Sequence, residues 1–209
     1  MKSYTRIGSN LYELHDRAYG ERQTAAGDLF GRGCEAERVR PFTSSARTLA
    51  LSLHREAIHC DPTHVGAWIH AGNLCFFMGD AVRARRYYRM AVAADPCSAV
   101  ACFNFAIALE ETGFFSDASV WYGKALTIHP RYADVHYNMG LLYFNVFGDL
   151  RKAAFHFRRF LECGDMRDPC REGARRMITY LAPQDLHVVR RPPTTTGKGG
   201  PEVITMIKG

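Results

Sequence analysis

The chain repeats itself at an interval of 34 residues, and this period constrains its fold more than any other feature of the sequence. The interval separates prolines, alanines in two registers, and glycines: Pro62, Pro96 and Pro130; Ala57, Ala91 and Ala125; Ala50, Ala84 and Ala118; Gly79 and Gly113. Four registers in phase indicate that one supersecondary unit is repeated. Because a single unit of this kind cannot bury its own apolar face, we expect the units to stack on one another.

Within each interval, apolar residues three or four positions apart predict two helices joined by a glycine-containing turn. The second interval shows what each position does. Trp68 is followed one helical turn later by the small residues Ala71 and Gly72, which let a neighbouring helix approach closely. Gly79 then permits a tight turn, and Tyr88 is expected to fill the groove between the two helices.

These residues resemble the tetratricopeptide repeat (TPR), a pair of helices with a 34-residue period. The second unit, 65–98, matches the family pattern at Trp68, Ala71, Gly72, Gly79, Ala84, Tyr88, Ala91 and Pro96. The third unit, 99–132, matches it at Phe105, Ala106, Leu109, Gly113, Ala118, Tyr122, Ala125 and Pro130. The resemblance implies an all-α, right-handed TPR solenoid of about four helix-turn-helix repeats with N- and C-terminal capping helices.

The first and fourth units depart from this pattern. The fourth, 133–166, has a turn at Phe144–Gly148 that is one residue longer than in the other units. The first, about 25–64, fits only if residues 34–42 form an inserted loop. Thr43 would then supply the N-cap of the helix that follows the loop.

Different patterns flank the repeats. A capping box that begins at Asn10 predicts an N-terminal helix within residues 1–24. An amphipathic segment at 169–182 predicts a helix that covers the last apolar face of the stack. The TPR domain is therefore expected to span 25–182, and the Pro-, Thr- and Gly-rich segment 183–209 is expected to be a flexible tail.

Composition excludes several classes of protein. With 47% hydrophobic and 23% charged residues, the chain has the composition of a globular protein. Its seven cysteines are an odd number and contain no CxxC pair, which argues against a disulfide framework and favours a reducing compartment. Since no run approaches a membrane-spanning length and the first residues lack a signal-like apolar segment, we expect a cytoplasmic protein without membrane association.

No recognised motif for nucleotide binding, nucleophilic catalysis or metal-dependent hydrolysis occurs in a supporting context, so we expect neither catalytic residues nor a cofactor. The best zinc candidate is the segment with His59, Cys60 and His64, to which His54 could add a fourth ligand. Packing of Cys60 near a helix end, and the favourable position of histidines at a helix C-terminus, explain these residues more simply. We therefore expect no metal site.

The predicted binding surface follows from the geometry of the stack, in which the first helix of every unit lines the concave face. Asn104 and Asn138 form a ladder along that face, and His70 has the equivalent place in the second unit. An Asn amide can bond the backbone of an extended peptide, and the resemblance implies the same role, although a merely polar repeat position explains the residues equally well. We predict that a protein or peptide segment binds there, contacted by His70, Asn73, Phe76, Phe103, Asn104, Ile107, Tyr137, Asn138 and Leu141.

One TPR subtype grips the C-terminal carboxylate of chaperones with two asparagines and flanking cations. Asn73 and Asn104 match the asparagines. However, Ile69, Asp134 and Asn138 stand where Lys or Arg would be expected. A carboxylate would lack its charge-assisted partners, so the sequence argues against such a clamp.

An alternative to peptide binding is an interaction with RNA or an acidic partner. The net charge of +6 is modest and spread along the chain, which argues against nucleic acid, but two groups of arginines could serve such a role. They are Arg83, Arg85, Arg86 and Arg89, and Arg167, Arg171, Arg175 and Arg176. Self-association through exposed apolar surface, or docking of the apolar tail segment 203–207 into a groove, also remain open at this point.

Overall fold

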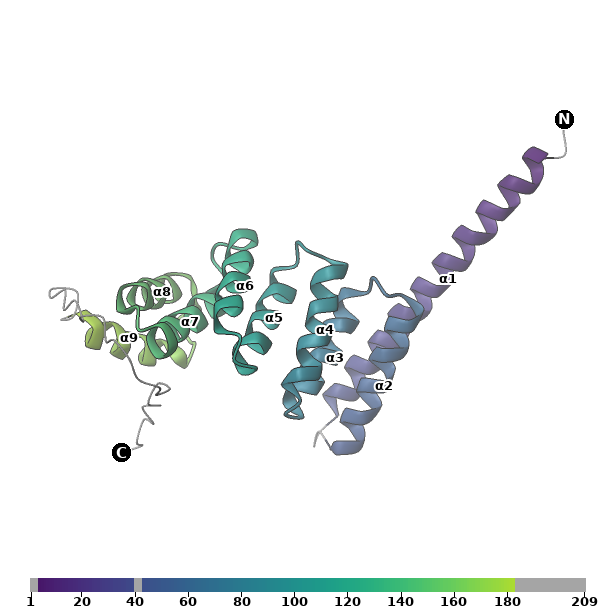
Figure 1. The fold of residues 1–209 in the computed structure, drawn as a ribbon. Helices are drawn as coiled ribbons and strands as arrows, with labels where there is room; N and C mark the ends of the chain where they lie inside the picture. The colour runs from purple at the N-terminus through teal and green to yellow at the C-terminus, as the bar shows by residue number, and fades with distance from the viewer. Residues whose placement is uncertain (1–3, 40–42, 183–209) are drawn as a thin grey trace, which may run out of the picture.

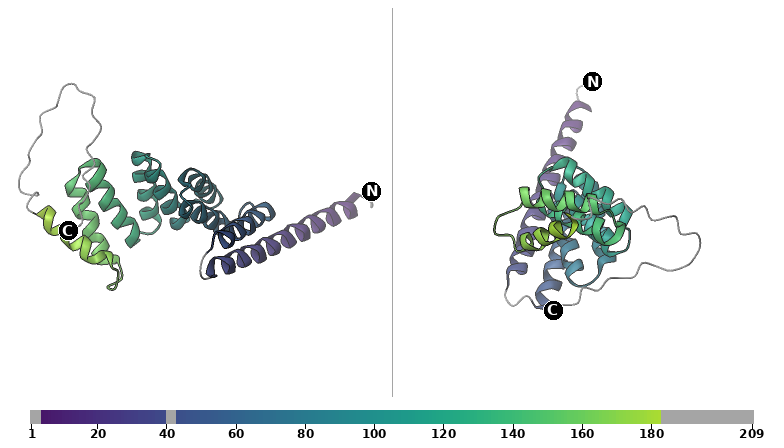
Figure 2. Two further views of the ribbon diagram at one scale, coloured as in Figure 1. Left: turned by 90° about the horizontal axis from the view of Figure 1, so that it is seen from below. Right: turned by 90° about the vertical axis from the view of Figure 1, so that its left-hand side faces the viewer.

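Residues 4–39 and 43–182 are described by the structure, a computed structural model, with side chains described from residue 18 onward. This part of the chain is helical throughout, and successive helices lie side by side along one axis (Figures 1 and 2). The helices are α1 Tyr4–Arg38, α2 Ser44–Cys60, α3 Val65–Phe77, α4 Ala81–Ala94, α5 Ala99–Glu111, α6 Phe115–Ile128, α7 Ala133–Leu142, the π-helical turn η1 Tyr143–Phe147, α8 Leu150–Cys163 and α9 Cys170–Leu181. The all-α solenoid expected from the repeat is thereby confirmed.

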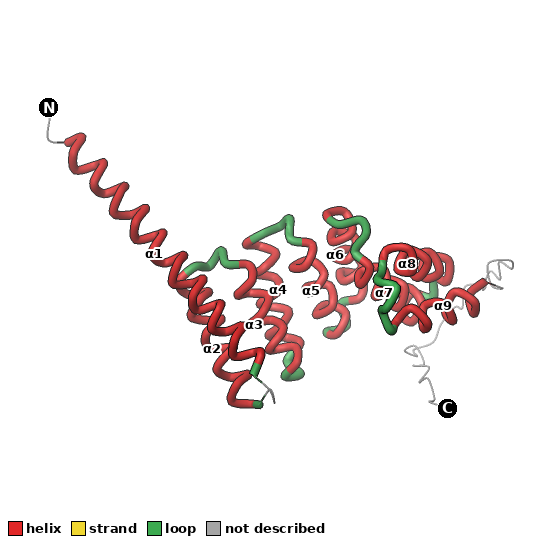
Figure 3. The backbone as a smooth tube through the Cα atoms, turned by 180° about the vertical axis from the view of Figure 1, so that it is seen from behind, coloured by secondary structure: helices red, strands yellow, loops and turns green. Residues whose placement is uncertain are grey.

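Short loops join the helices (Figure 3), and side chains at the loop ends begin the next helix. Thr43 accepts a hydrogen bond from the backbone N–H of Ala46, as the sequence predicted. Four further helices, α3, α4, α5 and α8, begin with a side chain that accepts from the N–H three residues ahead: His64, Asp80, Ser98 and Asp149. Each cap satisfies a backbone donor that the first helical turn leaves unpaired.

Glycines make the close contacts within the repeats. Gly79 and Gly113 both have a φ of +81°, the left-handed conformation that the turn between two antiparallel helices requires. Gly72 lies directly against the ring of Tyr88, where a Cβ atom would come within 2.5 Å of it. The expected packing of a large ring against a small residue of the facing helix is therefore present.

The core follows the axis of the stack. The alanines at the helix crossings, including Ala84, Ala91, Ala118 and Ala125, are fully buried. One continuous apolar cluster runs from α3 to α7, and a second joins α8 to α9 through residues such as Ala174 and Leu181. Helix α9 thus covers the end of the described stack, as expected of a capping helix.

Two local expectations are corrected by the structure. Helix α1 runs unbroken from Tyr4 to Arg38, so it shows no break near residue 24 and the inserted loop expected at 34–42 is wrong for residues 34–38. Helical periodicity was harder to read there because α1 has few neighbours. In the fourth unit, the extra residue of the turn is absorbed by the π-helical turn η1, which ends at Gly148 with a φ of +64°.

No helix in the described ranges is both long and apolar enough to cross a membrane, although α1 has 35 residues. The tail expected at 183–209, including segment 203–207, lies outside the described residues.

Candidate functional site on the first helices of the repeats

The nine residues predicted to contact a partner lie on the first helices of three repeats, α3, α5 and α7, and all are half-buried. Exposed surface therefore remains on each. The structure shows, however, that their polar groups are in three different situations, which the sequence pattern alone did not distinguish.

The first situation is an amide bound by the fold itself. Tyr122 of α6 donates a hydrogen bond to Glu110 of α5 over 2.8 Å, and the amide of Asn138 of α7 interacts with the same hydroxyl, which opposes the rise of its pKa. Burial raises the pKa values of both Tyr122 and Glu110. Asn138 thus links the third repeat to the fourth, which is a structural role that competes with peptide binding.

Asn73 is also bound by the fold. It accepts a hydrogen bond of 2.8 Å from the hydroxyl of Tyr88, within the second repeat. Burial raises the pKa of Tyr88, so this hydroxyl stays protonated and acts as the donor.

The second situation is an amide left available. Tyr88 is equivalent to Tyr122, and Asn104 is equivalent to Asn138, but the hydroxyl of Tyr88 already bonds Asn73. The side chain of Asn104 accordingly forms no hydrogen bond with any residue in the described ranges. It is half-buried and lies at the middle of the ladder, with Phe103 beside it.

The third situation concerns His70, which the repeat pattern placed on the ladder. Its Nδ1 atom lies 3.0 Å from an oxygen of Glu37 on α1, and the same oxygen lies 2.7 Å from Nε2 of His54 on α2. Glu37 and its neighbour Cys34 were not identified from the sequence. The signal was hidden because the connection between α1 and α2 is longer than in other repeats, so that residues on α1 are out of phase with the 34-residue period.

Much of the apolar surface predicted for the groove is used in packing. Phe103 has its ring centroid 5.1 Å from that of Tyr132, and Tyr137 has its centroid 5.0 Å from that of Phe160. Phe76, Ile107 and Leu141 pack against the two core clusters. The most exposed apolar side chain near them is Phe77 at the end of α3, which is 76% exposed.

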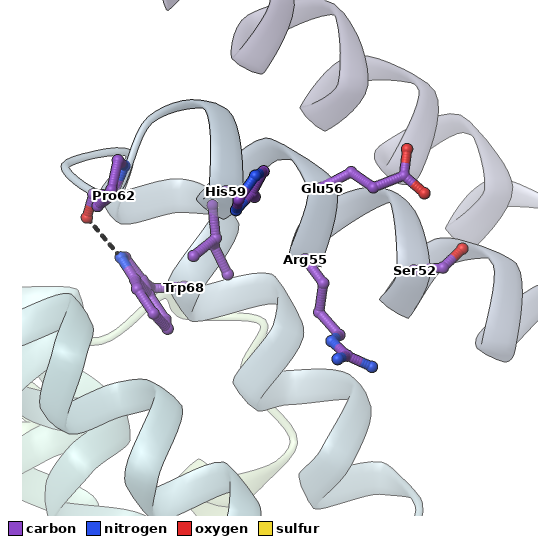
Figure 4. Close-up of a pocket in the computed structure, with 7 residues that line it drawn as sticks. Ser52, Arg55, Glu56, His59, Pro62 and Trp68 are labelled. Atoms are coloured by element: carbon purple, nitrogen blue, oxygen red, sulfur yellow. Dashed lines mark hydrogen bonds between the residues drawn. The ribbon is translucent and has the colours of Figure 1, made fainter.

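A hollow of about 700 Å³ lies elsewhere, between α2 and the start of α3 (Figure 4). Arg55, Glu56 and His59 line it from α2, and the indole of Trp68 closes it while donating a hydrogen bond of 2.8 Å to the carbonyl of Pro62. None of the nine predicted residues lines this hollow. His59 therefore faces a surface hollow, and His64 caps α3, where its Nδ1 accepts from the backbone N–H of Ala67.

The arginine groups are partly neutralised. Arg83 pairs with Asp80 at 2.5 Å, and Arg176 pairs with Glu172 at 3.2 Å. Arg171, one of the arginines named as available to an acidic partner, is only 7% exposed and donates a hydrogen bond to the carbonyl of Gly164. This correction leaves α9 with less free positive charge than its sequence indicated.

The repeat geometry and the comparisons with known proteins agree. A family model described as "TPR repeat" matches residues 108–146, from the end of α5 to η1. Residues 108–146 thus match a tetratricopeptide repeat, and the intervals before them share its 34-residue period. Among solved structures, MamA shares 20% identity at a TM-score of 0.63, over 79% of this chain and 84% of that one. PilF of Pseudomonas aeruginosa shares 19% identity at a TM-score of 0.65, over 79% and 71%.

Two further proteins bear on the comparison. YrrB, described as a TPR protein with an unusual peptide-binding site, shares 17% identity at a TM-score of 0.58, over 85% of this chain and 88% of that one. At such identities the structural neighbours establish the fold. A probable peptide N-acetylglucosaminyltransferase, SPINDLY of Hordeum vulgare, is 32% identical over 130 residues, which is 57% of this chain and 14% of the relative. This chain thus spans a small part of that protein's length.

Proposed function

We propose that this TPR protein is a non-catalytic interaction scaffold that binds a peptide or helical segment of a partner protein on the face formed by α3, α5 and α7. The observation that carries the proposal is the state of Asn104. Of its two equivalents on the ladder, His70 lies 3.0 Å from Glu37 and Asn138 interacts with the hydroxyl of Tyr122, whereas Asn104 makes no hydrogen bond to a described residue. A half-buried amide beside aromatic side chains can bond the backbone of an incoming segment.

The apolar neighbours of Asn104 support the same use. Phe103 and Ile107 are half-buried and flank it on α5, and Phe77 is largely exposed at the end of α3. Binding would remove this apolar surface from water, which supplies affinity, while the amide sets the register of the bound backbone. YrrB, a structural neighbour with a described peptide-binding site, shows that the fold can support such a function.

The test begins with selection of binding peptides from a random library displayed on phage. We expect selected peptides to bind Asn104→Ala about 5- to 10-fold more weakly than wild type, because one hydrogen bond contributes on the order of 1 kcal/mol. Asn145→Ala is the matched control, since Asn145 is an exposed amide on η1. Equal affinity of the peptides for wild type and Asn104→Ala would contradict the proposal.

A second experiment locates the bound segment directly. A photoreactive phenylalanine analogue in place of Phe77 should crosslink to a selected peptide, whereas the same analogue in place of Phe155 should not. Phe155 is the matched control because it is also exposed, at 54%, but lies on α8, a second helix of a repeat. Crosslinking from position 155 alone would place the binding surface elsewhere.

A further inference from the structure

Four side chains with metal-binding atoms meet where the first repeat contacts the second. Cys34 and Glu37 lie one turn apart on α1, His54 lies on α2, and His70 lies on α3. The ligand atoms of Cys34, His54 and His70 all lie within 4.8 Å of one another. These residues come from three different helices, so their convergence is produced by the tertiary fold and not by local sequence.

His54 provides an independent observation that points to a ligand. Its side chain is completely buried, and its Nδ1 atom has no hydrogen-bond partner among the described residues. A buried polar nitrogen without a partner costs free energy, and native proteins rarely retain one without a reason. Because Glu37 lies 2.7 Å from Nε2 of His54, the carboxylate can accept the proton of Nε2 and leave the lone pair on Nδ1. That is how a carboxylate prepares an imidazole for a metal ion.

Packing alone does not explain a histidine at this position. In the next two repeats the equivalent residues are Tyr88 and Tyr122, 34 and 68 residues further on. Both tyrosines fill the groove and bond a neighbouring side chain. The ring of His54 likewise covers Gly33, where any Cβ atom would collide with it, but the ring leaves one nitrogen unused.

The junction between the third and fourth repeats has a carboxylate, a phenol and an amide where the junction between the first and second repeats has Glu37, His54 and His70. Between the third and fourth repeats, Tyr122 donates a hydrogen bond to Glu110, and Asn138 of a third helix interacts with the same hydroxyl. The pair Tyr122 and Asn138 is 16 residues apart, as is the pair His54 and His70. The first junction thus keeps the carboxylate but replaces the phenol and the amide with two imidazoles, beside which Cys34 adds a thiol.

We propose that Cys34, His54 and His70 form a binding site for one zinc ion, with the Glu37 carboxylate orienting the two imidazoles. A thiolate with two imidazoles is a donor set that suits zinc, and rejects magnesium and calcium, which prefer oxygen ligands. In a tetrahedral zinc site the ligand atoms lie about 3.3 to 3.7 Å apart, so binding requires a contraction of at most about 1.5 Å from the present arrangement.

The surroundings are compatible with such a site. The ring of Phe30 lies against both imidazoles, with centroids 5.5 Å from His54 and 5.1 Å from His70, and shields them on one side. His70 keeps part of its side chain exposed, which gives the ion a path from solvent. Zinc binding would displace the thiol proton of Cys34 to solvent, since the thiolate is the ligand. The bound ion would then join α1, α2 and α3.

The test uses the full chain, stripped of metal with a chelator, and titrated with Zn²⁺ in competition with a chromogenic indicator. We expect one equivalent to bind and the melting temperature to rise with Zn²⁺ but not with Mg²⁺. Co²⁺ should give the strong visible bands and thiolate charge-transfer band of a tetrahedral site with sulfur.

The variants are chosen so that the fold is preserved. His54→Tyr and His70→Asn introduce the residues that the third and fourth repeats carry at these positions, and Cys34→Ser keeps the size of the side chain. Each should weaken zinc affinity at least 10- to 100-fold while the far-ultraviolet circular dichroism stays unchanged. Cys60→Ser and His59→Gln are matched controls on the same repeat and should bind zinc as wild type does.

Three results would overturn the proposal. One is that metal-free wild type takes up no stoichiometric zinc, in which case the cluster is only a carboxylate–imidazole network. Another is that zinc binds equally well to wild type and to Cys34→Ser, His54→Tyr and His70→Asn. The last is that zinc binding is lost in Cys60→Ser, which would place the ion at another cysteine.

Discussion

Acid should destabilise the fourth repeat through two buried histidines. His136 of α7 and His156 of α8 are 4% and 8% exposed, and their Nδ1 atoms lie 3.1 Å apart. Since Nε2 of His136 donates to the carbonyl of Pro130, its Nδ1 must accept the proton that His156 donates. Both rings are neutral in this arrangement. Protonation of His136 would remove the acceptor at its Nδ1, and protonation of His156 would place a charge in a buried site.

The magnitude follows from the pKa values. Burial, with smaller contributions from His136 and Lys152, lowers the pKa of His156 from 6.5 to about 4. Burial also lowers the pKa of His136, near which Arg159 and Glu162 act with opposite signs. A pKa that is lower in the folded state gives stability that is present above pH 6.5 and lost as the pH falls toward 4. For His156 alone the loss by about pH 4.5 is about 2.5 kcal/mol.

Urea unfolding at pH 7 and at about pH 4.5 measures this loss. Other groups also titrate in this range, so the informative quantity is the difference between wild type and His156→Phe, which lacks the titrating ring. We expect wild type to lose about 2.5 kcal/mol more than the variant. His129→Phe, a substitution of an exposed histidine, should behave as wild type. Equal losses in wild type and His156→Phe would refute the reasoning, because the pair would then be accessible to protons in the folded state.

Three glycines give predictions of different sign, each measurable by urea unfolding at neutral pH. Gly140→Ala should lower the free energy of unfolding by about 1 to 3 kcal/mol, because the new Cβ would lie 2.8 Å from the ring of Phe157; no loss would show that the ring can move aside. Gly113→Ala should cost about 1 kcal/mol, since Gly113 has a φ of +81°. Gly123→Ala should instead stabilise by about 0.5 to 1 kcal/mol, because Gly123 lies within α6 with open space beside it, and a loss there would indicate a contact absent from the structure.

The repeats could be predicted from sequence because their spacing is enforced by sterics. A small residue in the register of Gly72, which faces Tyr88, and a glycine in the register of Gly79 at a left-handed turn recur as Ala106 and Gly113, so the period is visible in the residues themselves. Helix α1 was harder, because the longer connection after it shifts Cys34 and Glu37 out of the 34-residue register. A cluster that depends on such a shift has no periodic signal.

The predicted ladder was only partly readable for a different reason. Asn104 and Asn138 are equivalent by position, and their difference arises from which side chain the preceding tyrosine bonds. Tyr88 donates to Asn73, while Tyr122 donates to Glu110 and interacts with Asn138. Side-chain partners on neighbouring helices are a property of the packed structure, which a single repeat pattern does not specify.

The two unusual histidine sites lie at opposite ends of the stack, and this placement matters for how the protein could respond to its environment. In a solenoid each repeat contacts only its neighbours, so a local change in stability spreads little. Acid acts on His136 and His156 at the fourth repeat, whereas zinc would act on His54 and His70 at the first junction. Asn104 lies on α5, between these two ends, and belongs to neither cluster. The proposed binding face can therefore keep its shape while the ends of the stack are stabilised or loosened independently.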